Sequence, residues 1–210
     1  MCEDKKKNNE LIESMNRTLN ITRYTRINAY KRCKEWNEFF NLVGFIYNLL
    51  LIIVSIIMLI YTGEENVELV ISIMLVILSI ITFSLDLFIA TQDFSSRAEQ
   101  YKISYNFIEG LLNELKFVDE NDTTRIKNIS KKYEDHIHSS INHEEIDYYR
   151  VNFEYPNEYL EPYKEITKIK KSNYSKLLVR KFLIKTALTL FLYPFFCLIS
   201  WILKKFKLDK

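Results

Sequence analysis

Residues 42–61 read LVGFIYNLLLIIVSIIMLIY, an apolar run interrupted by Asn48 and Ser55. At about 1.5 Å of rise per residue, a helix of this length spans the roughly 30 Å of hydrocarbon in a bilayer. Similar runs cover residues 69–90 and 182–203. A buried core helix of this length normally keeps a polar face, whereas these runs are apolar on nearly every side. The first two runs therefore predict transmembrane helices.

Apolar and charged residues are segregated along the chain. Of its 210 residues 48% are hydrophobic and 27% are charged, and the three apolar runs hold most of the aliphatic side chains. About forty mostly polar residues precede the first run. We therefore expect no cleaved secretory leader, in which the apolar segment would come first.

The residue types that catalysis or metal binding requires are sparse. Three scattered glycines exclude the clustered glycines of phosphate-binding loops, and three isolated cysteines predict free thiols in a reducing compartment. His136 and His138 point to nearly opposite sides of a helix. His143, Glu144 and Asp147 form H-E-x-x-D, which lacks the second histidine of a zinc protease motif. We expect no catalytic residue, metal or cofactor here, and interpret the segment as a polar helix start that caps backbone groups.

Basic residues predict the topology of the hairpin. They crowd the amphipathic segment RYTRINAYKRCKEW before the first run, and Arg97 and Lys102 follow the second run. The link TGEENVE between the runs contains glutamates and no basic residue. The positive-inside rule then places the link outside and both hairpin ends, with the N-terminus, in the cytoplasm. Trp36 suits the membrane interface just before the first span.

Helical periodicity continues beyond the second span. Apolar positions between Phe94 and Leu115 recur at steps of three and four residues and predict a stalk helix that enters the cytosol. The segment DENDTT ends it, and Ile126, Ile129, Tyr133 and Ile137 predict a second cytosolic helix. Between residues 146 and 163 the periodicity fails, which predicts a long connection.

The third run allows two arrangements. Lys185 lies one turn inside it, Pro194 interrupts it, and basic residues flank both ends. It can span the membrane with a proline kink, or fold back so that both basic ends stay inside. Because the basic residues adjoin an apolar run, we expect them to contact lipid headgroups rather than nucleic acid. The residues expected to make these contacts are Lys176, Arg180, Lys181, Lys204 and Lys205.

Together these patterns predict an all-α membrane protein, a transmembrane helical hairpin with cytosolic helices and a third C-terminal hydrophobic helix. Its expected parts are an N-terminal cytosolic amphipathic helix (1–41), the hairpin (42–90), a cytosolic helical region (91–175) and the basic-flanked C-terminal helix (176–210).

Polar residues recur every seven positions within the hairpin, as Asn41, Asn48 and Ser55 in the first span and Ser72, Ser79 and Asp86 in the second. Seven residues are nearly two helical turns, so each series forms one polar line. One interpretation is a helix pair held by small and polar side chains. The other is that several hairpins turn these lines towards a water-filled lumen. Asp86 favours the lumen, because an ionisable group at membrane depth normally faces water or a partner.

The basic segment RINAYKRCKEWN, the two spans and the stalk RAEQYKISYNFIEGLLNEL resemble the SLATT proteins, the SMODS- and SLOG-associating two-transmembrane effectors. The resemblance covers roughly residues 10 to 155 and includes INHEEIDYYR, which is similar to an Asn-His…Asp-Tyr stretch of the family at Asn142, His143, Asp147 and Tyr148. The third run resembles the C-terminal extension of a subgroup that is encoded beside reverse transcriptases.

The resemblance implies a pore-forming membrane effector of a bacterial anti-phage system, which acts in the inner membrane and stops growth by abortive infection. It also implies self-association and a sensor or signal-producing partner encoded nearby, such as a reverse transcriptase. No direct binding of nucleic acid is expected. The rival interpretation is a membrane anchor or scaffold that docks a soluble partner and conducts nothing.

Overall fold

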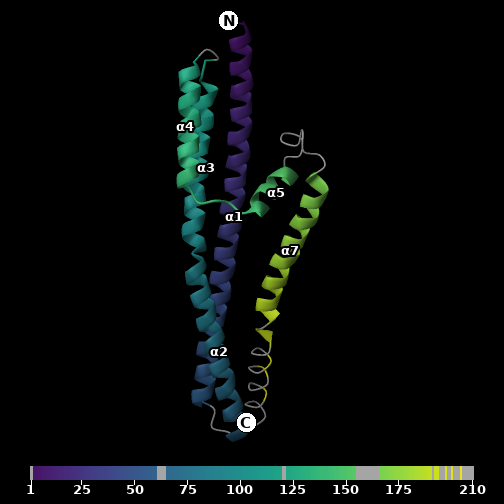
Figure 1. The fold of residues 1–210 in the computed structure, drawn as a ribbon. Helices are drawn as coiled ribbons and strands as arrows, with labels where there is room; N and C mark the ends of the chain where they lie inside the picture. Colours follow the sequence, from purple (N-terminus) through teal and green to yellow (C-terminus); the bar gives the residue numbers. More distant parts are fainter. Residues whose placement is uncertain are drawn as a thin grey trace. The chain divides into compact units, whose positions relative to one another are not determined.

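The computed structural model describes residues 2–60, 65–119, 122–154 and 166–190, together with 192, 193, 197, 200 and 204. Most of these residues are helical and none of them lies in a strand, which confirms the predicted all-α class. The helices with defined bounds are α1 (Cys2–Ile60), α2 (Glu65–Gln92), α3 (Phe94–Lys116), α4 (Thr123–Ser139), α5 (Glu145–Glu154) and α7 (Ile166–Leu190) (Figure 1).

The chain forms two compact units. The bundle unit comprises Met1–Glu35 and Phe94–Leu177, and the hairpin unit comprises Trp36–Asp93 and Leu178–Lys210. Helix α1 is continuous from Cys2 to Ile60 and therefore contributes its first part to the bundle unit and its second part to the hairpin unit.

The bundle unit is held by an apolar core between α1, α3 and α4. Leu19 of α1, Ile108 of α3 and Ile129 of α4 have fully buried side chains in one cluster, which Leu111, Leu112 and Leu115 complete. The predicted apolar face of the stalk helix is thus the face that α3 buries. Asp122 caps α4, because its side chain accepts a hydrogen bond from the backbone N–H of Arg125. Asp122, within DENDTT, thereby marks the start of α4, in the segment where the sequence predicts the break between the two helices.

Two local predictions were wrong. Residues 145–154 form helix α5, although their periodicity is poor. Asp93 interrupts the helix between α2 and α3 with a positive φ of 45°. Aspartate tolerates this left-handed conformation better than most residues other than glycine.

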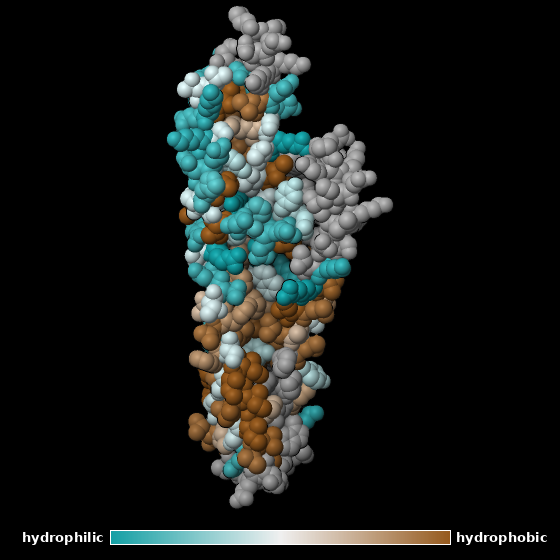
Figure 2. All heavy atoms as spheres, viewed as in Figure 1, coloured by the Kyte–Doolittle hydropathy of each residue, from teal (hydrophilic) through white to brown (hydrophobic). Residues whose placement is uncertain are grey.

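The hairpin unit exposes apolar side chains over most of its surface. Two helical stretches, within 8–60 and 67–116, are long and apolar enough to cross a membrane. In the most apolar 18-residue segment of each stretch, only 28% and 17% is buried inside the structure. The core helix of a soluble protein would be mostly buried. Figure 2 shows hydrophobic residues gathered over the hairpin unit and hydrophilic ones over α3 and α4. Lipid is the solvent that such a surface requires.

The third apolar run is described only in part. Helix α7 contains its first residues and ends at Leu190. Pro194, Lys205 and the link 61–64 lie outside the described residues, so the two arrangements of the third run both stay open.

Candidate functional site

The predicted pore-lining residues differ in exposure. Asn41, Asn48 and Asp86 are exposed, and Ser55, Ser72 and Ser79 are half-buried. Each serine hydroxyl donates to the backbone carbonyl four residues earlier, at 2.7 to 2.8 Å. The amide of Asn48 does the same to Gly44 at 3.0 Å. The Ser72 hydroxyl also makes a long contact of 3.9 Å with the sulfur of Met58, which links α2 to α1.

Asn48 and Asp86 both lie beside Gly44, where α1 and α2 approach closely. A methyl group added at Gly44 would be 3.7 Å from the carboxylate oxygen Oδ1 of Asp86 and 3.6 Å from Cδ1 of Ile89. The carbonyl of Gly44 accepts the Asn48 amide. The structure therefore brings the amide of one polar line and the carboxylate of the other to neighbouring places on the hairpin.

Helix α7 covers a different side of the hairpin. Ser84 and Phe88 of α2 line a groove beneath α7, and Asp86 lies two residues from each of them. Two residues correspond to about 200° around a helix, so Asp86 faces away from α7. On α1, the Tyr47 hydroxyl donates to the carbonyl of Leu188 at 3.1 Å, and Asn48 is turned about 100° from Tyr47 towards Gly44. Asn48 and Asp86 thus flank the side of the hairpin that α7 leaves open.

The residues predicted to contact lipid headgroups lie in different settings. Lys176, Arg180 and Lys204 are exposed, and Lys205 lies outside the described residues. Lys181 is half-buried and holds its ammonium 5.5 Å from the centre of the Trp36 ring. Lys185 holds its ammonium 5.6 Å from the same ring and 4.9 Å from that of Phe39. Lysine and aromatic side chains therefore gather where α7 passes the beginning of the first span.

A buried ionic cluster of the bundle unit joins α1 to α5. Arg32 donates from Nε and Nη2 to the two carboxylate oxygens of Asp147, each at 2.9 Å, and from Nη1 to Glu144 at 2.8 Å. The side chain of Arg32 is 12% exposed and that of Asp147 is 3% exposed. Burial opposes the charge of Arg32, but the hydrogen bond and the charge of Asp147 outweigh it and raise the pKa of Arg32 above its ordinary value.

Arg26, Asn28 and Tyr101 fix the chain segment before α5. Arg26 donates to the carbonyl of Ile141 and to the hydroxyl of Ser140, and Tyr101 donates to the carbonyl of Asn142 at 2.8 Å. Asn28 donates to the carbonyl of Asp147 at 3.2 Å. Burial lowers the pKa of Arg26 and raises that of Tyr101. The segment 140–147 is therefore bound to α1 through groups that water does not reach freely.

The H-E-x-x-D segment begins a helix, which confirms the capping interpretation. Asp147 accepts a hydrogen bond from the backbone N–H of Glu144 at 3.2 Å, just before α5 starts at Glu145. In a capping box, the side chain at the third helical position accepts a hydrogen bond from the backbone N–H of the N-cap residue, and this is the bond that Asp147 and Glu144 form. Burial, and then the charge of Arg26, lowers the pKa of His143. Among the residues that the structure describes, no group of His, Cys, Asp and Glu is arranged to hold a metal ion.

Sequence reasoning missed the pairing of α1 with the segment before α5. It treated Arg26 and Arg32 as basic residues of the membrane interface, whereas Arg26 is 1% exposed and Arg32 is paired with Asp147. A pairing over 115 residues leaves no periodic trace in one sequence.

Comparison with known proteins identifies one family. Residues 8–204 match the family described as SMODS and SLOG-associating 2TM effector domain family 5. No curated protein and no solved structure matches the chain. The match covers the bundle unit from residue 8 onward, both predicted spans and the whole third apolar run.

Proposed function

Because the chain belongs to the SMODS and SLOG-associating two-transmembrane effector (SLATT) family, and is therefore a membrane effector of defence systems, we propose that it assembles into a homo-oligomeric pore. The pore permeabilises or depolarises the bacterial inner membrane of an infected cell, which stops growth by abortive infection. This action requires no catalytic residue and no cofactor.

The observation that carries this proposal is an exposed carboxylate and amide on the open side of the hairpin. Asp86 and Asn48 lie in apolar segments, beside Gly44 and away from α7. A carboxylate that faces hydrocarbon is costly, so ionisable residues in membrane segments normally face water or a partner. The serines on the same side have satisfied their hydroxyls within their own helices and do not need a partner helix. Water in a shared lumen is the surrounding that suits all of them.

A lumen requires several copies of the chain. One hairpin has two helices and cannot enclose a water path, whereas a ring of hairpins can direct its polar sides inward. Helix α7 would then lie on the outside of the ring, against lipid. A ring of Asp86 carboxylates would favour cations over anions.

The orientation of the hairpin follows from the basic flanks in the sequence. We place the link between α1 and α2 outside and the bundle unit in the cytoplasm. There the bundle unit would hold the pore closed or receive the signal. The family is defined by its association with SMODS and SLOG proteins, and we propose a signal-producing partner encoded nearby, with a reverse transcriptase as one candidate.

Two substitutions test the lumen. Asp86→Asn should leave assembly intact and weaken cation preference, because it removes the ring of negative charge. Asn48→Leu should close the path, because an apolar wall expels water. The measurement is the reversal potential and conductance of purified protein in planar bilayers under a salt gradient.

Ser84→Ala is the matched control, because Ser84 lies two residues from Asp86 but beneath α7. It should change neither conductance nor selectivity. If Asp86→Asn conducts with unchanged selectivity, Asp86 is not on the pore wall. If the wild-type chain assembles and conducts nothing, the rival function, a non-conducting anchor for a soluble partner, replaces the pore.

A further inference from the structure

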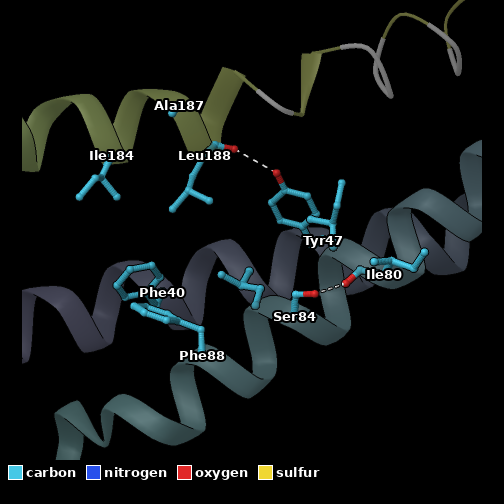
Figure 3. Close-up of a pocket in the computed structure, with 10 residues that line it drawn as sticks. Phe40, Tyr47, Ile80, Ser84, Phe88, Ile184, Ala187 and Leu188 are labelled. Carbon is cyan, nitrogen blue, oxygen red and sulfur yellow. Dashed lines mark hydrogen bonds between the residues drawn. The ribbon is translucent and has the colours of Figure 1, made fainter.

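An apolar groove separates α7 from the hairpin on the side opposite Asp86. Its volume is about 500 Å³, and Phe40, Tyr47, Ser84, Phe88, Ile184 and Leu188 are among its lining residues (Figure 3). The hydroxyl of Tyr47 donates to the carbonyl of Leu188 and that of Ser84 donates to the carbonyl of Ile80. The two hydroxyls of the lining therefore already have acceptors, and the groove offers its occupant an apolar wall.

The groove is elongated along the helices. On α1 it extends from Phe40 to Tyr47, seven residues or about 10 Å of helix, and on α7 it extends over one turn from Ile184 to Leu188. Phe40 and Phe88 pack edge to face at one end, with ring centroids 5.2 Å apart. A narrow apolar channel of this length, open towards the hydrocarbon of the bilayer, fits part of an acyl chain.

Two ammonium groups lie at the Phe40 end of the groove. Lys185 follows Ile184, which lines the groove, and its ammonium lies 4.9 Å from the ring of Phe39. Lys181, one turn earlier on α7, lies over Trp36. Tryptophan and lysine at this level suit the interface between headgroups and hydrocarbon. Basic pockets between membrane helices bind the headgroups of anionic lipids.

We propose that this groove is a binding site for one anionic phospholipid. The phosphate of its headgroup pairs with Lys181 and Lys185, and one acyl chain lies between α7 and the hairpin, against Phe40, Tyr47 and Ser84. The charge at one end of an otherwise apolar channel selects this occupant over a peptide or an uncharged lipid. The site goes beyond the proposed pore and does not depend on conduction.

Native mass spectrometry of the purified full-length chain tests the site, with phosphatidylglycerol and phosphatidylcholine of identical acyl chains as probes. The wild-type chain should retain phosphatidylglycerol preferentially. The double variant Lys181→Ala/Lys185→Ala should lose that preference, by about fivefold in affinity for each lysine removed. The matched control Lys127→Ala/Lys131→Ala removes the same charge from exposed positions of α4 in the bundle unit and should keep the preference.

A second pair of variants tests the groove itself. Ala187→Trp places an indole in the groove and should abolish retention of both lipids, whereas Thr189→Trp, on the other side of α7, should retain them. Circular dichroism of each variant verifies its helical content. Equal retention of the two lipids by the wild-type chain, equal effects of the two double variants, or undiminished binding in Ala187→Trp would each overturn the site.

Discussion

Asp147 combines three interactions at one residue. Its carboxylate accepts both arms of the Arg32 guanidinium and the backbone N–H of Glu144, and its carbonyl accepts the amide of Asn28. Taking two charges out of water is costly, and only good geometry with further hydrogen bonds offsets that cost. The arrangement therefore specifies where the start of α5 binds α1. Removal of Arg32 leaves the buried Asp147 without this partner, and removal of Asp147 leaves Arg32 with the exposed Glu144 alone.

Asp147→Asn should destabilise the bundle unit by about 3 kcal/mol, because the amide keeps the size of the side chain but removes the buried counter-charge of Arg32 and leaves it only the exposed carboxylate of Glu144. The measurement is denaturant unfolding of the purified chain in detergent, followed by circular dichroism. Glu144→Gln is the control, since Glu144 is 52% exposed and an exposed ion pair contributes at most about 1 kcal/mol. Equal losses for the two variants would contradict a buried pair.

Two histidines should make the bundle unit sensitive to mild acid. His136 stacks on Phe107 with ring centroids 4.3 Å apart and shares a hydrogen bond with Ser104, and the pKa values of His136 and His143 lie below their ordinary value of 6.5. Burial, followed by the charge of Arg26, causes both shifts; Asp147 partly opposes the shift of His143. Between the lowered pKa and 6.5 the unfolded chain binds more protons than the folded one, so stability falls as the pH drops.

The free energy of unfolding should therefore be lower at pH 5.5 than at pH 7.5, and the double variant His136→Gln/His143→Gln should flatten this difference. His138 is exposed and offers the control His138→Gln, which should leave the pH dependence unchanged. A wild-type chain that is more stable at pH 5.5 would show that the two imidazoles bind protons on folding instead of losing them.

At the level of helices, the sequence predicts the buried faces that hydrophobic periodicity marks. The spacing of Ile108, Leu112 and Leu115 in α3 and of Ile126 and Ile129 in α4 predicts the faces that the bundle buries, because each helix repeats its apolar contact every three or four residues. Helix α5 escapes prediction because it is short and is held by Arg32 and Asn28 rather than by an apolar stripe. The interruption at Asp93 escapes it because aspartate is also common within helical surfaces.

The candidate site was also predictable only in part. The heptad spacing predicts that Asn48 and Asp86 each belong to a polar line, but one sequence does not say which sides of α1 and α2 meet. The close approach at Gly44 and the position of α7 provide that information.

Gly110 gives a prediction about helix α3. It lies within the helix and is exposed, and a methyl group added there would meet nothing within 4 Å. Gly110→Ala should therefore stabilise the chain by about 0.5–1 kcal/mol, because alanine loses less backbone entropy on forming a helix. Denaturant unfolding measures the gain, and Glu109→Ala, at the neighbouring exposed position, controls for a general surface effect. A loss of stability would indicate that the face of α3 around Gly110 packs against a partner.

On the scale of the whole molecule, the hairpin unit and the bundle unit expose surfaces that suit different solvents. The hairpin unit exposes large apolar side chains such as Leu42, Phe45, Ile80 and Phe83, which are stable in lipid. The side of the hairpin that carries Asn48 and Asp86 suits lipid least. A single chain in a bilayer therefore leaves one side poorly solvated, and self-association along that side is the simplest way to remove the mismatch.

Site-specific cross-linking distinguishes that side from its opposite. In a variant without native cysteines, Asp86→Cys should form a covalent dimer with a short bismaleimide, because the polar sides of neighbouring copies face one another. Ser84→Cys, two residues away and beneath α7, should stay monomeric, although both positions are exposed in the single chain. An amine-reactive reagent should in parallel trap a ladder above the dimer in the same membranes. Cross-linking at Ser84→Cys but not at Asp86→Cys would place α7 at the interface and the polar lines outside it. A chain that stays monomeric with both reagents could form no lumen at all.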